Sequence, residues 1–217
     1  MLIEVVSDVV CPWCFIGKRR LEKALSLVGR QDLRVQWKAF ELNPHAPKEG
    51  LDRQQYRALK FGSTAYAKQL EAHVAGAGAE EGINFRFDRI ERVPNTLDAH
   101  RLIWLAGQDG QQDALVDNLF RAYFLEGEDV GRAEVLKRIA SESGLDSGRV
   151  DELLNSDLGR SEVQAEEREA HSRGVNGVPA FFVSGMPVAS GAQKPEILAS
   201  VLGPALEQCS LEDAGCA

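Results

Sequence analysis

Residues 2–28 read LIEVVSDVVCPWCFIGKRRLEKALSLV, and this stretch indicates how the chain folds. Leu2 to Val6 is a short apolar run rich in β-branched residues, which is typical of a buried strand. A helical pattern follows, with Pro12 suited to its first turn and Gly29 to its C-terminal end. Leu33 to Phe40 then alternates apolar and polar residues, as a second strand does. The segment therefore predicts a strand–helix–strand unit with a right-handed crossover.

After the second strand the pattern becomes helical and stays so for more than a hundred residues. We expect helices over 52–61, 63–79, 96–109, 111–126, 131–143, 146–156 and 157–173. The only strand candidate among them is the weak run 83–87. Strands return as a hairpin at 180–183 and 186–189, followed by a helix from Pro195 to about Leu202. This order predicts an α/β fold with an all-helical domain inserted between the second and third strands.

Length and composition exclude several classes of protein. The 217 residues carry a net charge of −8, which argues against nucleic acid as a partner. The first 60 residues are nevertheless mildly basic, with 11 Lys and Arg against 7 Asp and Glu. No apolar run approaches the roughly 18 residues of a membrane span, and the N-terminus lacks the basic start of a signal peptide. We therefore expect a cytoplasmic protein that has no membrane partner.

The motif Cys11-Pro12-Trp13-Cys14 carries the clearest chemical signal. Two cysteines at positions i and i+3 of a first helical turn lie about 5–6 Å apart, the separation that a disulfide needs. Cys11 would start the helix, where free N–H groups and the macrodipole favour a thiolate. We expect Cys11 to be the exposed nucleophile and Cys14 the resolving thiol. The alternatives are two inert thiols or half of a zinc site, although no second cluster has zinc-ligand spacing.

Four segments together resemble the DsbA-like thioredoxin-fold oxidoreductases, and specifically their FrnE-like branch. They are SDVVCPWCFIGK at 7–18, the stretches Pro94 to Thr96 and Ala99 to Arg101, GVPAFF at 177–182, and SGAQ at 190–193. The resemblance implies a thioredoxin-like domain made of residues 1–41 and 157–217, with the helical insertion domain at 42–156. It also implies a cis Val178–Pro179 bond facing the cysteine motif, where the backbone of Val178 would pair with an extended substrate. Val178, Pro179 and Trp13 are therefore candidate substrate-binding residues, although Trp13 could equally serve in packing.

Three more side chains have open roles. Asp8, three residues before Cys11, either relays a proton for Cys14 or caps the turn that follows it. Cys209 and Cys216 lie in an acidic tail outside the family pattern. They are either a second redox pair passing electrons to the first, a local disulfide, or two free thiols.

The function that these observations predict is thiol–disulfide oxidation, reduction or isomerisation through a mixed disulfide on Cys11. The partners would be protein or small-molecule thiols and disulfides, and the chain would be a monomer or homodimer. We expect no metal and no bound cofactor, only a redox-active disulfide that glutathione or another thiol recycles. The alternative is a glutathione-dependent isomerase or transferase that resembles 2-hydroxychromene-2-carboxylate isomerase. Those relatives typically have Ser where this chain has Cys11. A non-catalytic binding module is a third class.

Overall fold

Strand β1 (Leu2–Ser7) lies at the centre of the main sheet, and five of its six residues are buried. The computed structural model describes residues 1–30 and 32–214, with side chains of the last helix as far as Glu207. Within it the sheet has the order β2-β1-β5-β6, with β2 at Arg34–Ala39, β5 at Ala180–Val183 and β6 at Met186–Ser190. β1 pairs in parallel with β2 and antiparallel with β5. Segments at the two ends of the chain therefore build one sheet.

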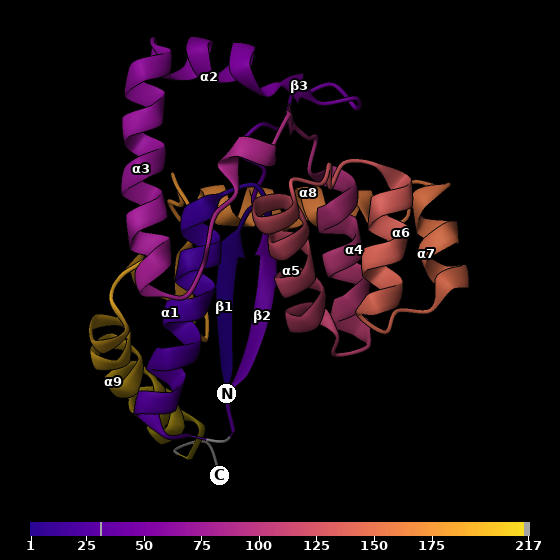
Figure 1. The fold of residues 1–217 in the computed structure, drawn as a ribbon. Coiled ribbons are helices and arrows are strands. Elements are labelled where there is room, and N and C mark those ends of the chain that lie inside the picture. Colours follow the sequence, from indigo (N-terminus) through magenta and orange to yellow (C-terminus); the bar gives the residue numbers. More distant parts are fainter. Residues whose placement is uncertain (31, 215–217) are drawn as a thin grey trace.

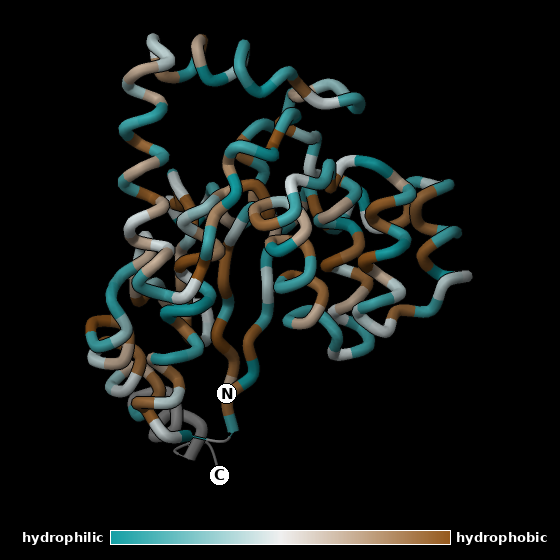
Figure 2. Tube along the Cα trace, viewed as in Figure 1, coloured by the Kyte–Doolittle hydropathy of each residue, from teal (hydrophilic) through white to brown (hydrophobic). Residues whose placement is uncertain are grey.

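Helix α1 (Pro12–Val28) makes the crossover from β1 to β2. Cys11 is its N-cap, Pro12 occupies the first helical position, and Gly29 ends it at φ 71°, a left-handed conformation that glycine adopts without strain. α1 packs against the last helix, α9 (Pro195–Ala214). Figure 1 shows both helices beside the strands, and Figure 2 shows β1 as an almost continuous hydrophobic run.

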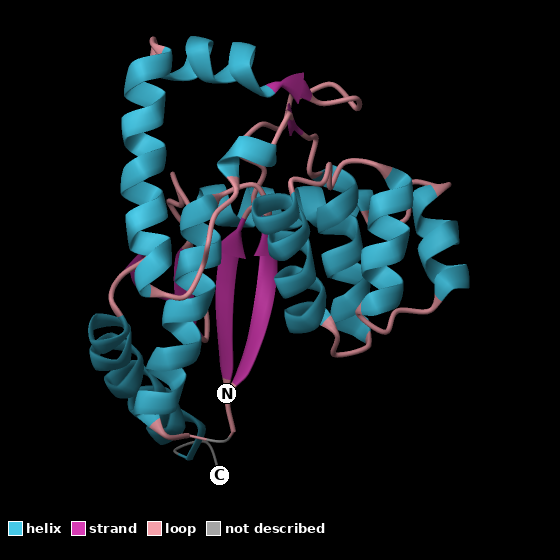
Figure 3. Cartoon of the chain, viewed as in Figure 1, coloured by secondary structure: helices cyan, strands magenta, loops and turns pink. Residues whose placement is uncertain are grey.

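The segment between β2 and β5 is mostly helical, as the sequence predicts (Figure 3). Its elements are α2 (Arg53–Phe61), α3 (Thr64–Glu80), a 3₁₀ turn η1 (Phe87–Arg89), α4 (Leu97–Gln108), α5 (Gln112–Arg121), a short π-helix η2 (Ala122–Glu126), α6 (Ala133–Glu142), α7 (Ser147–Leu154) and α8 (Arg160–Ser172). Helix α8 contacts β2 of the main sheet. The structure thus has a thioredoxin-like sheet with a helical insertion after its second strand. The exact boundaries of the insertion, 42–156, stay a prediction.

Two details of this segment differ from the sequence prediction. The insertion is not wholly helical, because β3 (Leu51–Asp52) and β4 (Arg92–Val93) form a short antiparallel pair. The candidate strand at 83–87 is not a strand. Its backbone finds no strand partner, and the N–H of Arg86 instead donates to the carbonyl of Phe124 at 2.8 Å.

The last helix is also longer than predicted, since α9 continues past Leu202 to Ala214. Leu198, Leu202 and Leu206 are fully buried at intervals of four residues. This apolar stripe continues beyond Pro204, which lies inside the helix and lacks the N–H of one helical hydrogen bond. Burial of the stripe therefore outweighs a local helix-breaking signal. Among the described residues, no helix is both long and apolar enough to cross a membrane.

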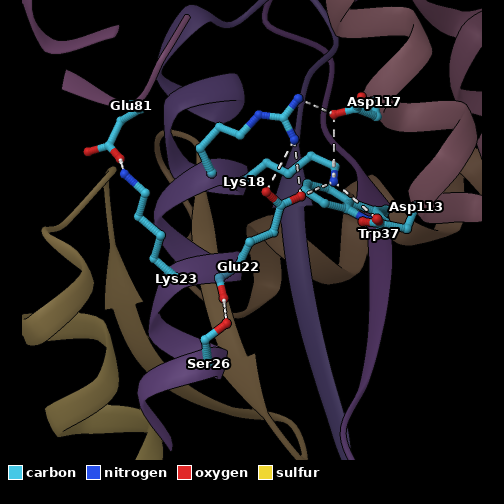
Figure 4. Close-up of polar contacts among 9 residues, drawn as sticks. Lys18, Glu22, Lys23, Ser26, Trp37, Glu81, Asp113 and Asp117 are labelled. Atoms are coloured by element: carbon cyan, nitrogen blue, oxygen red, sulfur yellow. Dashed lines mark hydrogen bonds and ion pairs between the residues drawn. The ribbon is translucent and has the colours of Figure 1, made fainter. Parts of the chain in front are cut away.

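A buried lysine joins α1 to the insertion, as Figure 4 shows. The Nζ of Lys18 contacts Glu22 of its own helix and lies 3.1 Å from Oδ2 of Asp113 on α5. Asp117, one turn further along α5, is 3.7 Å away. The indole of Trp37 on β2 donates to Asp113 at 3.3 Å. One cation therefore connects α1 with α5, whose Asp113 in turn accepts from β2.

We predict that Lys18→Met lowers the free energy of unfolding by about 1–2 kcal/mol, measured by urea denaturation. The loss stays moderate because Lys18 is only 2% exposed while Asp113 is 63% exposed, so the freed carboxylate regains water. Lys23→Met on the same helix is the control. Its side chain is 53% exposed, and its partner Glu81, although only 5% exposed, keeps an ion pair with Arg20 at 2.6 Å, so the loss should stay below about 0.5 kcal/mol. Equal losses in the two variants would contradict the role of burial.

Candidate active site

Cys11 occupies the junction between the loop after β1 and the first turn of α1. Its N–H donates to the carbonyl of Asp8, and its own carbonyl accepts from the N–H of Cys14, both at 3.0 Å. Its backbone is extended, at φ −92° and ψ 113°, as an N-cap residue requires. The Sγ of Cys11 lies 3.6 Å from the carbonyl oxygen of Val178, 167 residues later in the chain.

The prediction that Cys11 is exposed is wrong for this structure, because its residue surface is only 5% accessible. Val178 covers the thiol from the loop before β5. Cys11 nevertheless lines a cavity of about 340 Å³ that opens to the surface. Access to the thiol therefore passes through that cavity.

Cys14 lies one turn further along α1 and is fully buried. Burial raises the pKa of its thiol well above the ordinary value, and the hydrogen bond and charge of Cys11 raise it further. A hydrogen bond with the backbone of Asp8 lowers this pKa, and the smaller effect of the charge of Asp8 raises it. Both cysteines are free thiols in the structure. Cys14 therefore holds its proton at neutral pH and needs a nearby group to accept it before it can react.

Asp8 is fully buried, and its carboxyl group contacts two residues from distant segments. Its Oδ2 accepts from the N–H of Leu42 at 2.7 Å, and its Oδ1 lies 3.3 Å from Nε2 of His100 on α4. Burial alone would lower the pKa of His100, but the hydrogen bond and charge of Asp8 outweigh it, so this pKa is raised. Asp8 and His100 thus form a buried acid–histidine pair beside Cys14.

Glu41 extends this cluster with a second buried carboxyl group. Its Oε2 atom is buried and has no hydrogen-bond partner among the described residues. Burial raises the pKa of Glu41 from 4.5 to about 7, the positive charge of His100 opposes this, and the charges of Glu167 and Asp8 add to it. The sequence analysis missed Glu41 and His100 as neighbours of Asp8, since 33 and 92 residues separate them from it along the chain.

The predicted substrate-binding residues surround the same cysteine. Trp13 is half-buried, lines the cavity, and its ring centroid lies 5.7 Å from that of His73 on α3. The Val178–Pro179 peptide bond is cis. Pro179 packs on Gly17 of α1 so closely that a Cβ at position 17 would lie 2.8 Å from its Cγ. Gly17 is therefore required for the approach of Pro179 to α1, a role that the sequence analysis did not assign.

The cavity beside Cys11 is walled by α1, α2, α3, β4, the 3₁₀ turn η1 and the π-helix η2. Most of its lining is apolar, but α2 contributes three cations, Arg53, Arg57 and Lys60. The basic excess of the first 60 residues was the sequence signal for these cations.

The sequence analysis named Cys209 and Cys216 as a candidate second redox pair. Cys216 and the side chain of Cys209 lie outside the described residues. Within those residues no group of three or more His, Cys, Asp or Glu is placed to hold a metal ion.

The sheet, the helical insertion and the cysteine pair at the start of α1 define a thioredoxin-fold protein of the inserted type. The chain belongs to the DSBA-like thioredoxin domain family, whose model matches residues 2–203. It is 34% identical to the probable DsbA oxidoreductase SCO1869 from Streptomyces coelicolor. That likeness covers 95% of this chain and 90% of the other, with a TM-score of 0.88.

Two further solved structures share the fold at lower identity. A 2-hydroxychromene-2-carboxylate isomerase is 19% identical, over 97% of this chain and 98% of its own, with a TM-score of 0.72. The cytosolic disulfide reductase DsbM from Pseudomonas aeruginosa, solved with GSH, is 17% identical over 95% of this chain and 100% of its own, with a TM-score of 0.68. These likenesses show the fold alone.

We predict that Glu41→Gln stabilises the protein at high pH but not at low pH. The carboxyl is protonated in both states below about pH 4, so the substitution changes little there. Above 4.5 the unfolded chain ionises while the folded protein holds its proton up to about 7, so the wild type loses stability over this range. The gain of the variant should grow through the same range to on the order of 2 kcal/mol. Thermal melts at pH 4 and pH 8 measure it.

The control for this pH effect is Glu49→Gln, because Glu49 is exposed and substitution there removes the same charge. The stability difference between Glu49→Gln and the wild type should not grow between pH 4 and pH 8. A gain for Glu41→Gln that is equal at pH 4 and pH 8 would contradict the role of the buried carboxyl.

Proposed function

We propose that this protein is a thiol–disulfide oxidoreductase in which Cys11 forms the mixed disulfide and Cys14 resolves it. One observation carries the proposal: the two thiols occupy the first turn of α1, and only Cys11 of the pair lines the cavity. Membership in the DSBA-like family supports an oxidoreductase or isomerase role. The position of each thiol supports its proposed role, because Cys11 lines the cavity and Cys14 does not.

The reaction with a disulfide substrate proceeds in two exchanges. The thiolate of Cys11 attacks one substrate sulfur, forming a mixed disulfide and releasing the other sulfur as a thiolate. Cys14 then loses its proton and attacks the sulfur of Cys11, which closes the Cys11–Cys14 disulfide and releases the second substrate thiolate. Two electrons pass from the protein to the substrate, and the reverse sequence oxidises a dithiol or isomerises a protein disulfide.

Asp8 is the proposed acceptor of the Cys14 proton. Asp8 lies in the loop that leads into α1, where its carbonyl accepts from the N–H of Cys11, and its charge raises the pKa of the Cys14 thiol. His100 contacts the same carboxylate and acts as a positioning residue. Because Asp8 is fully buried, its proton must reach solvent through neighbouring groups, of which His100 is the titratable group in direct contact with it.

Substrate contacts in this proposal come from Trp13, from the backbone of Val178 and from Pro179. Trp13 lines the cavity beside Cys11, and the carbonyl of Val178 is already within reach of the Cys11 thiol. An incoming substrate that pairs with Val178 would take over this contact. The pairing is by backbone and therefore tolerates varied sequences.

The direction of net reaction is proposed to be reduction or isomerisation rather than strong oxidation. The residues between the cysteines are Pro12 and Trp13, which offer no imidazole to stabilise the reduced thiolate. Glutathione or another thiol would recycle the protein, and a cytoplasmic location fits this direction because thiols are kept reduced there. The solved structure of DsbM, which shares the fold, contains GSH.

Cys11→Ser is predicted to abolish reduction of insulin disulfides to the uncatalysed rate, because no nucleophile remains at the cavity. Cys14→Ser should instead accumulate a mixed disulfide on Cys11, visible as an added substrate mass, because nothing resolves it. Retention of full activity by Cys11→Ser with a glutathione-linked substrate would favour the isomerase alternative. Absence of activity with every thiol and disulfide tested would favour a binding module.

Asp8→Asn is predicted to slow the second exchange about a hundredfold while changing the first exchange little. Single-turnover kinetics with a disulfide substrate separate the two steps, since each releases one thiolate. The slowing should fade as the pH rises, because the Cys14 thiol then ionises without help. A second variant, His100→Gln, leaves the carboxylate in place and should slow the same step less. Equal slowing of both exchanges would indicate a structural effect.

A further inference from the structure

The cavity beside Cys11 extends well beyond what disulfide exchange itself requires. Of the two reacting sulfurs only that of Cys11 borders this space, yet the space measures about 340 Å³ and is lined by residues of α2 and α3. That volume is within the range of sites for small molecules. Its apolar walls include Phe61, Leu70, Val74, Phe87 and Ile90. The walls thus suit a compact apolar body.

The charges in the lining are unbalanced. Arg53, Arg57 and Lys60 face a single acid, Glu71, which leaves two positive charges in excess when His73 is neutral. Both guanidinium groups pair with the same carboxylate oxygen, Oε1 of Glu71, and Arg57 does so at 2.7 Å. The Nη2 of Arg57 is buried and finds no hydrogen-bond acceptor among the described residues. A cationic wall in apolar surroundings favours an anionic group on the ligand.

The cations are held in place by contacts of their own. Nη1 of Arg53 donates to the carbonyl of Phe87 at 2.7 Å. Nζ of Lys60 donates to the hydroxyl of Tyr56 at 2.6 Å, and that hydroxyl donates to Asn43 at 2.7 Å. The opposite wall includes Tyr123 and Phe124 from the π-helix η2, an element that is frequent at functional sites. Groups that are already oriented lose less entropy when a ligand binds.

We propose that this cavity binds the body of a small disulfide or thiol that carries an apolar, aromatic or branched group and a carboxylate. Its sulfur would react at Cys11, and its carboxylate would pair with the cations of α2. This inference rests on the function proposed above and adds the class of substrate. The thiolate of Cys11 attacks the near sulfur, Cys14 completes the reduction, and the two sulfurs of the substrate leave as thiolates.

The test compares two aromatic disulfides, the dianionic dithiobis(nitrobenzoate) and the uncharged dithiodipyridine. Reduced protein is mixed with each in a stopped-flow instrument, and the second-order rate constant of the first exchange is taken from thiolate release. The ratio of the anionic to the uncharged rate constant cancels the intrinsic reactivity of Cys11 within one variant. We expect Arg57→Gln to lower this ratio about tenfold and Glu71→Gln to raise it.

Lys68→Gln is the matched control, since Lys68 is exposed on α3, near this wall, and does not line the cavity. It should leave the ratio unchanged. Lys60→Gln tests the same wall at an exposed position, where substitution does not threaten folding, and should lower the ratio about threefold. An unchanged ratio in Arg57→Gln and Lys60→Gln would overturn the proposal. An equal fall in Lys68→Gln would also overturn it, because the effect would then be long-range attraction.

Failure of this inference is distinguishable from failure of the proposed function. In a background that carries Cys209→Ser and Cys216→Ser, so that no tail thiol reacts, Cys11→Ser should abolish the exchange with both disulfides. If the exchange depends on Cys11 but the ratio is unchanged in Arg57→Gln and Lys60→Gln, the oxidoreductase function stands. Only the proposal of a small anionic substrate then fails. Faster reduction of an unfolded protein disulfide than of either aromatic disulfide would likewise contradict the proposed substrate class.

Discussion

From Cys14 to Arg20 helix α1 is buried on nearly every side, with only Arg19 partly exposed, and much of the site follows from this constraint. Cys14, Phe15, Ile16, Gly17, Lys18 and Arg20 are all buried, although a surface helix ordinarily keeps one face in water. The strands and α9 cover one part of this surface, and the helices of the insertion cover the rest. Polar side chains on a helix that is buried in this way need hydrogen-bond or ion-pair partners. Lys18 accordingly meets acids from α1 and α5, and Gly17 makes room for Pro179.

The same burial sets the chemistry of the cysteines. Removal from water raises the pKa of Cys14, whereas Cys11, one turn earlier, still borders a cavity. An aromatic cluster of Phe15, Phe85, Phe120 and Phe124 packs directly behind this turn, with Phe15 and Phe120 stacked at 5.1 Å. The insertion therefore contributes apolar surroundings to this turn and most of the walls of the cavity. The sheet alone would leave α1 half exposed.

A buried polar cluster carries a desolvation cost in free energy, as Asp8, His100 and Glu41 illustrate. Two carboxyl groups and one imidazole share a space from which water is largely excluded, and the pKa of Glu41 rises to about 7 as a result. Apolar residues at these three positions would avoid the free-energy cost of removing ionisable groups from water. Carboxyl groups with perturbed pKa values concentrate at functional sites, which supports the proton path proposed for this cluster.

The sequence by itself determined the elements and the reactive motif. The helices of the insertion, the strand–helix–strand unit and the position of Cys11 at the start of α1 were all predictable, because periodicity, caps and turns depend on residues close together in the chain. Only the tertiary structure decided which groups meet. Asp8 contacts Leu42 and His100, 34 and 92 residues away, and Cys11 is covered by Val178, 167 residues away. The cations of α2 line the same cavity as Cys11, its walls come from six separate elements, and no local pattern encodes which faces a folded chain brings together.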